Sequence, residues 1–272
     1  MQIRVIVSGA GGRMGREVLR AVSSADDMVV VAGVDVAPQL AGKSLAKLSG
    51  VPTLQLAVEP DLDAALVNTQ ADVLVDFTVP GQGQVNALKA LRHGVRPVVG
   101  TTGIPQEALE EIRASAEERG LGALVAPNFA IGAVLMMKFA AEAARYMPHV
   151  EIIEFHHDGK ADAPSGTALK TAQMITEAVD LPPRPRTEKM VLSCARGGEV
   201  RRSANQGEVN IHAVRLPGLV AHQEVILGGL AQTLTIRHDS LGRESFMPGV
   251  LLGIRKVMNV TGLVYGLEGV LD

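Results

Sequence analysis

Aromatic residues and net charge are both scarce in this sequence. It has no Trp, five Phe and two Tyr, and its 26 basic and 29 acidic residues leave a formal charge of -3. Proteins that bind nucleic acid usually combine a basic stripe with aromatic rings that stack on the bases. This composition argues against such a protein, so we expect no nucleic-acid partner.

The sequence also has only one cysteine and no long apolar run. The single cysteine, Cys194, cannot form an internal disulfide, and no His or Cys cluster has zinc-ligand spacing, so we expect no metal site. Apolar runs such as 133–137 fall well short of the roughly 20 residues that cross a bilayer. The first residues lack the pattern of a secretory signal. We therefore expect a cytoplasmic protein with no membrane partner, in which Cys194 fills space rather than acting as a nucleophile.

The first half of the chain alternates short β-branched runs with helical patterns. This alternation is typical of βαβ units around a parallel sheet. We predict strands at 3–8, 29–34, 73–77, 96–99 and 123–126, and helices at 15–23, 82–93 and 106–119.

After Phe129 the pattern of the chain changes. We predict helices at 133–147 and 167–179, a strand at 150–155, a proline-rich connection at 181–186, and strands at 208–216, 219–227 and 232–238. Pro217-Gly218 and Gly228-Gly229 separate the last three strands, which we interpret as an antiparallel meander. A helix at about 248–258 is expected to return to the first domain. The predicted fold class is α/β, with an N-terminal Rossmann-type parallel sheet and a second α+β domain built on a mainly antiparallel sheet.

A glycine-rich turn, Gly9-Ala10-Gly11-Gly12-Arg13-Met14-Gly15, follows the first predicted strand. In this context backbone N–H groups can approach a pyrophosphate. Met14 stands where G-x-G-x-x-G would have its third glycine, so the better register is Gly9, Gly12 and Gly15. Asp35 ends the second strand about 20 residues after Gly15, where a carboxylate can bind ribose hydroxyls. These features predict a dinucleotide site; the alternative is a tight turn followed by a loop carboxylate.

Two further loops follow predicted strands. They are Gly100-Thr101-Thr102-Gly103 and Ala126-Pro127-Asn128-Phe129. Ligands of open α/β sheets bind outside the carboxyl ends of the strands, so we expect these loops to border a nicotinamide. Taken alone, the first loop could equally be an ordinary loop that leads into a helix, and Asn128 could equally be an ordinary turn residue.

The segment from Glu154 to Thr167 combines several reactive side chains. A strand delivers His156 and His157, Lys160 follows in a short loop, and Ser165-Gly166-Thr167 opens a helix. Histidine suits proton transfer near neutral pH, and adjacent strand residues face opposite ways, so the two histidines should differ in role. The helix start, the Thr167 hydroxyl and the Lys160 ammonium predict a receptor for a carboxylate. Ser165 by itself is an ordinary N-cap.

These motifs give the chain a family resemblance. It resembles the 4-hydroxy-tetrahydrodipicolinate reductase family, also called dihydrodipicolinate reductase, of the diaminopimelate route to lysine. The resemblance covers nearly the whole sequence, through GAGGRMG, DFT at 76–78, GTTG, APNFAIG and, most specifically, E-x-H-H-x-x-K-x-D-A-P-S-G-T. It implies an oxidoreductase that uses NADH or NADPH to reduce 4-hydroxy-tetrahydrodipicolinate to tetrahydrodipicolinate.

The resemblance also implies roles for residues and domains. His156 would be the catalytic proton donor or acceptor and Lys160 the second proton donor, while His157, Gly166 and Thr167 would hold the dicarboxylate substrate. The implied cofactor contacts are Gly9, Ala10, Gly11, Gly12, Arg13, Met14, Asp35, Gly100, Thr101, Thr102, Ala126, Pro127, Asn128 and Phe129. We place the dinucleotide-binding domain at 1–129 plus 240–272 and the substrate-binding and oligomerisation domain at 130–239. The family is typically a homotetramer assembled through the sheet of the second domain.

The cofactor preference follows from one departure from the family pattern. Some members carry an Arg after the acidic residue, which can meet a 2′-phosphate, whereas this chain has Val36 there. Asp35 would also repel such a phosphate, so we expect NADH to be preferred, with NADPH left open because Arg13 or Lys43 could compensate. Two other functions stay open: a different NAD(P)-dependent dehydrogenase, which would need no HH-x-x-K segment, and a dinucleotide-sensing module, which would need no acid/base pair.

Overall fold

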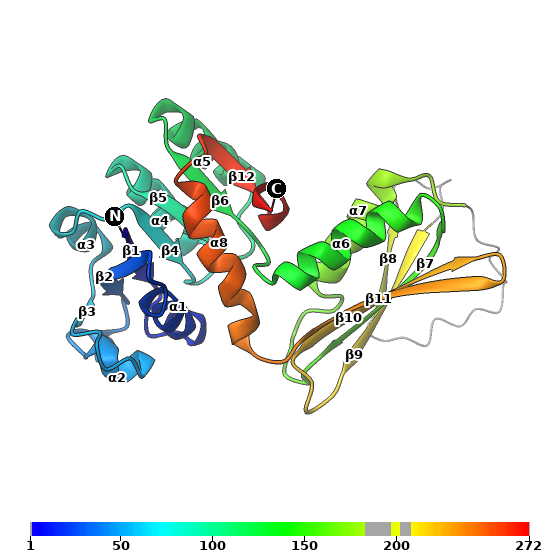
Figure 1. The fold of residues 1–272 in the computed structure, drawn as a ribbon, viewed down its shortest axis with the longest axis horizontal. Helices are drawn as coiled ribbons and strands as arrows, with labels where there is room; N and C mark the ends of the chain where they lie inside the picture. Colours follow the sequence, from blue (N-terminus) through cyan, green and yellow to red (C-terminus); the bar gives the residue numbers. More distant parts are fainter. Residues whose placement is uncertain (1, 183–196, 202–207, 272) are drawn as a thin grey trace. The chain divides into compact units, whose positions relative to one another are not determined.

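The computed structural model describes residues 2–182, 197–201 and 208–271. The chain forms two compact units, Met1–Phe129 with Phe246–Asp272 and Ala130–Ser245, which we call the first and second unit (Figure 1). Cys194 and most of the proline-rich connection predicted at 181–186 lie outside the described residues. Among those described, no helix is long and apolar enough to cross a membrane.

The first unit is built on a seven-stranded parallel sheet in the order β12-β6-β5-β4-β1-β2-β3. Its strands are β1 (Ile3–Ser8), β2 (Met28–Val34), β3 (Val58–Glu59), β4 (Val73–Asp76), β5 (Arg96–Val99), β6 (Gly122–Val125) and β12 (Gly262–Tyr265). Its helices are α1 (Arg13–Ser23), α2 (Leu45–Ser49), α3 (Leu62–Asn68), α4 (Gln82–Arg92), α5 (Gln106–Glu118) and α8 (Met247–Val257), with short 3-10 turns η1 (Pro38–Leu40) and η3 (Leu267–Val270). The order of the strands reverses between β1 and β4.

Helices pack on both faces of this sheet, which explains the unbroken apolar runs of its central strands. Val5, Ile6 and Val7 of β1 are completely buried, as are all three valine and leucine residues at 73–75 of β4. Two separate clusters of buried side chains, one around Ile6 and one around Ile112, fill the space between sheet and helices. Such burial on both sides leaves only the strand ends free for function.

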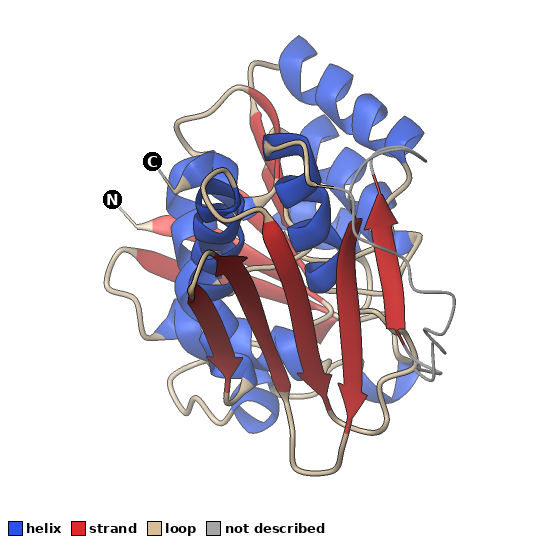
Figure 2. Ribbon diagram, turned by 90° about the vertical axis from the view of Figure 1, so that its right-hand side faces the viewer, coloured by secondary structure: helices blue, strands red, loops and turns tan. Residues whose placement is uncertain are grey.

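The second unit has a five-stranded mixed sheet in the order β11-β10-β7-β9-β8. Its strands are β7 (His149–His156), β8 (Gly197–Arg201), β9 (Glu208–Arg215), β10 (Ala221–Gly229) and β11 (Gln232–Ser240), and its helices are α6 (Ile131–Ala144) and α7 (Gly166–Ala178), followed by the 3-10 turn η2 (Arg243–Phe246). Residues alternate between buried and half-buried along β7 and β10. The buried side chains face α6 and α7, and Figure 2 shows the opposite face of the sheet toward the viewer, with no described helix over it.

The predicted fold class is confirmed, but the antiparallel meander is wrong. β10 and β11 form the expected hairpin, whereas β9 pairs in parallel with β7, which lies between β9 and β10. Turn residues and alternation mark where strands begin and end but do not select their neighbours. The predictions from the sequence also did not include α2, α3, β3, β8 and β12, each of which has at most seven residues.

Candidate active site

The predicted cofactor residues meet at one edge of the seven-stranded sheet. The glycine-rich turn follows β1, Asp35 follows β2, the loop at Gly100 follows β5, and the loop at Ala126 follows β6. Because all these strands run in parallel, their carboxyl ends lie on the same edge, beside the reversal of strand order where open α/β sheets bind ligands.

The turn after β1 needs its glycines for steric reasons. Gly9 has φ +78°, and a Cβ on Gly15 would lie 2.0 Å from the Gly9 carbonyl oxygen, so only glycines allow the helix to start this close to the strand. Gly12 is the N-cap and α1 begins at Arg13, two residues before the predicted start. The exposed Gly12 and Arg13 therefore stand at a helix N-terminus, which is a suitable place for a phosphate group.

Asp35 braces the glycine-rich turn directly. Its Oδ2 accepts a hydrogen bond from Gly11 N–H at 2.9 Å, and its Oδ1 accepts one from Ala37 N–H at 3.1 Å. A Cβ on Gly11 would lie 2.9 Å from Asp35 Oδ2 and 2.2 Å from Leu40 Cδ1, so Gly11 could not be replaced without moving its neighbours. This cradle fits a dinucleotide: a close backbone turn, a helix start and a carboxylate that retains lone pairs for ribose hydroxyls.

The remaining predicted cofactor residues divide into buried and exposed members. Thr101 is 5% exposed, Ala126 is fully buried, and Phe129 is 1% exposed with its ring 5.7 Å from that of Phe77. Met14, Gly100 and Asn128 are half-buried, and Thr102 and Pro127 are exposed. Phe129 is thus a core side chain, and only its backbone is placed to face a ligand.

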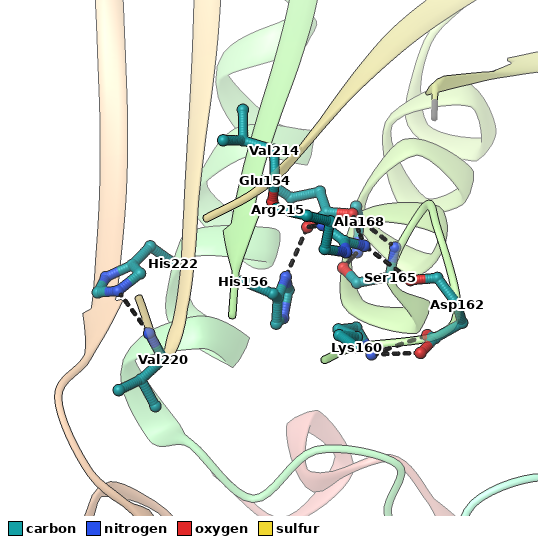
Figure 3. Close-up of polar contacts among 10 residues, drawn as sticks. All are labelled: Glu154, His156, Lys160, Asp162, Ser165, Ala168, Val214, Arg215, Val220 and His222. Carbon is teal, nitrogen blue, oxygen red and sulfur yellow. Dashed lines mark hydrogen bonds and ion pairs between the residues drawn. The ribbon is translucent and has the colours of Figure 1, made fainter. Parts of the chain in front are cut away.

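In the second unit, His156 ends the central strand β7 and is held by Glu154. The His156 Nδ1 and Glu154 Oε2 atoms are 2.5 Å apart, with the histidine side chain 15% exposed and the glutamate completely buried (Figure 3). Burial by itself would raise the pKa of Glu154, but the hydrogen bonds from His156 and Arg215 together outweigh it and lower that pKa to about 2. Glu154 is therefore ionised and can only accept, so His156 Nδ1 carries the proton and Nε2 is the nitrogen left for chemistry.

Arg215, at the end of β9, makes a bidentate ion pair with Glu154. Its two terminal nitrogens each lie 2.8 Å from a carboxylate oxygen of Glu154, and its side chain is 1% exposed. Arg215 Nη2 also donates to the Asp162 carbonyl at 2.7 Å, and Glu154 Oε1 accepts from Ser165 N–H at 3.0 Å. Glu154 and Arg215 thus join the ends of β7 and β9 to the loop that leads into α7 (Figure 3).

Lys160 lies on the same side of this cluster as His156 (Figure 3). Its ammonium is 2.6 Å and 2.8 Å from the two carboxylate oxygens of Asp162, and this contact lowers the pKa of Asp162. Asp162 is 62% exposed, so the pair is a surface one that an incoming anion can compete with. Asp162 therefore holds the Lys160 ammonium on this side of the cluster, and an incoming anion could replace Asp162 as its partner.

Two of the other predicted substrate residues, Gly166 and Thr167, lie at the start of α7. Ser165 is its N-cap and accepts from Ala168 N–H at 3.3 Å, Gly166 is the exposed first residue of the helix, and half-buried Thr167 is the second. His157 follows the last residue of β7 and is exposed. Within the described residues, no group of three or more His, Cys, Asp or Glu side chains is arranged to hold a metal ion.

Sequence reasoning missed two residues of this cluster. Glu154 stood in the quoted motif without a role, and its position two residues before His156 on a strand was the available signal, because such residues share a face. Arg215 gave no signal, since it lies 61 residues from Glu154 and meets it only through the parallel pairing of β7 with β9.

A glycine-rich turn and Asp35 at the ligand edge of one unit, and a buried carboxylate behind a histidine in the other, are features of a two-unit Rossmann-type oxidoreductase. Two family models cover almost the whole chain: dihydrodipicolinate reductase, N-terminus, over residues 3–129, and dihydrodipicolinate reductase, C-terminus, over residues 132–271. The chain belongs to the dihydrodipicolinate reductase family.

Individual relatives agree with this assignment. The chain is 51% identical over 271 residues to the 4-hydroxy-tetrahydrodipicolinate reductase of Halalkalibacterium halodurans, covering 99% of this chain and 100% of that protein. It is 49% identical to the enzyme of the same name from Moorella thermoacetica, covering 99% and 98%. A solved dihydrodipicolinate reductase from Paenisporosarcina sp. TG-14, bound to dipicolinate, is 46% identical with a TM-score of 0.85 over 100% of both chains. An amine dehydrogenase from Mycobacterium smegmatis, 15% identical with a TM-score of 0.69 over 97% and 95% of the chains, shares the fold.

These findings confirm the predicted family and reaction. The protein is an oxidoreductase that reduces 4-hydroxy-tetrahydrodipicolinate to tetrahydrodipicolinate in the diaminopimelate route to lysine, and its reductase family implies a nicotinamide cofactor. The two alternatives, another dehydrogenase and a dinucleotide-sensing module, are thereby set aside.

Proposed function

We propose that His156 Nε2 handles the proton of this reaction. A nicotinamide, when bound, would supply a hydride. Loss of the 4-hydroxyl group of the substrate as water gives a conjugated imine, hydride addition to this imine gives an enamine, and the enamine carbon must then take up a proton. The observation that carries the proposal is the contact between His156 Nδ1 and the buried carboxylate of Glu154. Glu154 fixes the tautomer of the ring through Nδ1 and leaves Nε2 as the nitrogen through which a proton can be transferred.

We further propose that Lys160 and the start of α7 bind the carboxylates of the substrate. A planar dicarboxylate, dipicolinate, is bound by the relative from Paenisporosarcina. In this chain the Lys160 ammonium, the first N–H groups of α7, the Thr167 hydroxyl and the exposed His157 ring are the donors suited to such a ligand. Lys160 would exchange the Asp162 carboxylate for that of the substrate and serve as the second proton donor.

The cofactor would be held by the cradle of the first unit, with NADH preferred. The proposed contacts are Gly9 to Met14, Asp35, Gly100 to Thr102 and Ala126 to Phe129. Asp35 is charged and stands beside Val36, which is 78% exposed, so a 2′-phosphate would meet a carboxylate and an apolar side chain. Arg13 and Lys43 are exposed and are the cations that could offset this repulsion. In this proposal the first unit binds the dinucleotide and the second unit binds the substrate.

The uncovered face of the five-stranded sheet supports a homotetramer. Ile153, Phe155 and Ile226 are half-buried on that face, between ion pairs such as Glu151 with His212 and His222 with Asp239. A sheet face on which apolar side chains alternate with ion pairs, and over which no described helix lies, is suited to binding another chain. A cytoplasmic location and the absence of a nucleic-acid partner stay predictions.

Steady-state kinetics with coupled substrate synthesis tests the proposal. Dihydrodipicolinate synthase would supply the unstable substrate while the absorbance of the reduced cofactor is followed with either NADH or NADPH. We expect a higher kcat/KM with NADH and a KM for substrate that rises in Lys160→Ala. A clear preference for NADPH would indicate that Arg13 or Lys43, rather than Asp35, determines binding at the 2′ position of the ribose. An unchanged KM in Lys160→Ala would show that Lys160 does not bind the substrate.

A further inference from the structure

Asp76 is a completely buried carboxylate at the carboxyl end of β4, with no role in the reaction described so far. Its Oδ1 accepts from Thr78 N–H at 3.1 Å, from the Thr78 hydroxyl at 2.8 Å and from the Thr101 hydroxyl at 2.8 Å. Its Oδ2 accepts from Asn86 Nδ2 at 2.7 Å. All four contacts are donors, and none of them belongs to a charged group. A buried carboxylate without a cation is costly, and it persists only where its hydrogen bonds are complete.

These hydrogen bonds connect the ends of three neighbouring strands. Thr78 lies just beyond β4, Thr101 lies beyond β5, and Asn86 also donates to the Ser8 hydroxyl, at the end of β1, at 3.2 Å. Ser8 and Asp76 are paired in register across β1 and β4, where the strand order reverses. Ligands of open α/β sheets bind at this point.

The contacts reach residues on either side of the proposed cofactor site. Thr101 is one of the proposed cofactor contacts, and Gly9, which begins the glycine-rich turn, has no room for a Cβ because the Phe77 carbonyl oxygen would lie 2.6 Å away. Phe77 is the residue directly after Asp76, and its N–H donates to the Ser8 carbonyl at 3.2 Å. The hydrogen bonds of Asp76 therefore fix the position of the turn after β1 relative to the loop after β5.

We propose that Asp76, with Asn86, is a positioning residue that sets these two loops for cofactor binding. This inference rests on the proposed cofactor site and adds to it a requirement for the buried hydrogen-bond pattern. In Asp76→Asn, the new amide would present an N–H donor to the donor of Asn86. In Asn86→Asp, two carboxylates would stand at the 2.7 Å of the present hydrogen bond. Either change leaves buried groups that repel each other.

The double variant Asp76→Asn/Asn86→Asp restores the pairing of one amide donor with one carboxylate acceptor, with the carboxylate now at position 86 instead of position 76. The amide introduced at position 76 can donate to the carboxylate introduced at position 86, while the carbonyl oxygen of that amide still accepts from Thr78 and Thr101. The new carboxylate can accept from the Ser8 hydroxyl and from Gln82, which already donates to Asn86 at 2.8 Å. A rescue by this exchange would assign the effect to hydrogen-bond direction rather than to loss of packing.

The experiment measures the Kd of NADH by calorimetry for the whole enzyme, at a temperature well below the melting point of each variant. We expect the two single variants to bind NADH about 10-fold or more weakly and the double variant to recover most of that loss. The KM of the cofactor should rise in parallel. Asp72→Asn is the matched control, because Asp72 lies at the opposite end of β4 and accepts from Arg4 N–H at 2.8 Å, and it should leave the Kd unchanged.

Two further variants separate the outcomes. Thr78→Val removes one hydroxyl donor to Asp76 and keeps the inference testable should the single variants fail to fold; it should weaken NADH binding by a factor of about 3 to 10. Asp35→Ala tests the proposed cofactor site itself. If Asp35→Ala weakens NADH binding while the Asp76, Asn86 and Thr78 variants lower only the melting temperature, Asp76 is a structural residue and the inference is wrong. If Asp35→Ala also leaves the Kd unchanged, the proposed cofactor site is wrong.

Discussion

Each unit of this protein contains a completely buried carboxylate at a strand end, but the two are held in different ways. Asp76, in the first unit, receives hydrogen bonds from hydroxyl, amide and backbone groups only. Glu154, in the second unit, faces the cation Arg215 and the titratable ring of His156. Neutral donors fix the geometry of loops, whereas the charged and ring partners of Glu154 also fix the tautomer of a histidine that can exchange a proton. The difference agrees with the proposed roles of the two units, in which the first binds the cofactor and the second performs acid/base chemistry.

The largest effect should come from the histidine that distinguishes the second unit. His156→Gln is expected to lower kcat by a factor of about 10² to 10⁴, as for loss of general acid/base help, with little change in the KM of the substrate. Steady-state kinetics together with the Kd of NADH checks this, and the Kd should stay at the wild-type value. A kcat near that of the wild type would remove His156 from the mechanism and end the contrast between the units.

Breaking the ion pair behind His156 should cost the second unit much of its stability. Arg215→Met would leave Glu154 buried without its cation, and we expect the free energy of unfolding to fall by about 3 to 5 kcal/mol. Urea unfolding measures this loss, with Arg255→Met as the control, because Arg255 of α8 makes a comparable two-point ion pair with Asp27, in which both side chains are exposed. Equal effects of the two substitutions would show that the buried pair is no more important than a surface one.

Protonation of Glu154 in acid should lower the stability of the folded protein over a defined range of pH. Its pKa is lowered from 4.5 to about 2, so its ionised form contributes stability that is complete above pH 4.5 and is lost as the pH falls toward about 2. The urea midpoint of the wild type should therefore fall more steeply across this range than that of Glu154→Gln, which has no carboxylate to protonate at that position. Parallel slopes for the two proteins would mean that Glu154 is not held in the ionised form by the folded chain.

The smallest effect concerns the five-stranded sheet of the second unit, which has one face without a described helix over it. Ile226→Glu places a charge on that face and should weaken the proposed assembly by about 1 to 3 kcal/mol per contact, shifting the proposed tetramer toward smaller species on dilution. Leu169→Glu, at a 42% exposed position on α7, is the control and should not change the assembly. Light scattering after size-exclusion chromatography distinguishes them. An unchanged mass for Ile226→Glu would place the interface elsewhere.

Local patterns in the sequence determined most of the elements and the ends of strands where function lies. The glycine-rich turn, Asp35 and the start of α7 could be predicted because each depends on contacts within a few residues or on regular βαβ spacing. The reaction was predicted through the family resemblance, whose most specific motif contains His156, Lys160 and Thr167 within one short segment. Short elements such as β3 and β12 gave no signal, because two to four residues are too few for a periodic pattern.

Only the tertiary structure decided which distant side chains meet. The parallel pairing of β7 with β9 brings Arg215 to Glu154. The neighbouring strands β1, β4 and β5 bring Ser8 and Thr101 to the region of Asp76, and α4 brings Asn86. Alternating hydrophobicity identifies a strand but carries no information about which strand will lie beside it, because every exposed strand edge offers the same backbone donors and acceptors. The neighbours are chosen by burial of whole faces, and with them the partners of both buried carboxylates.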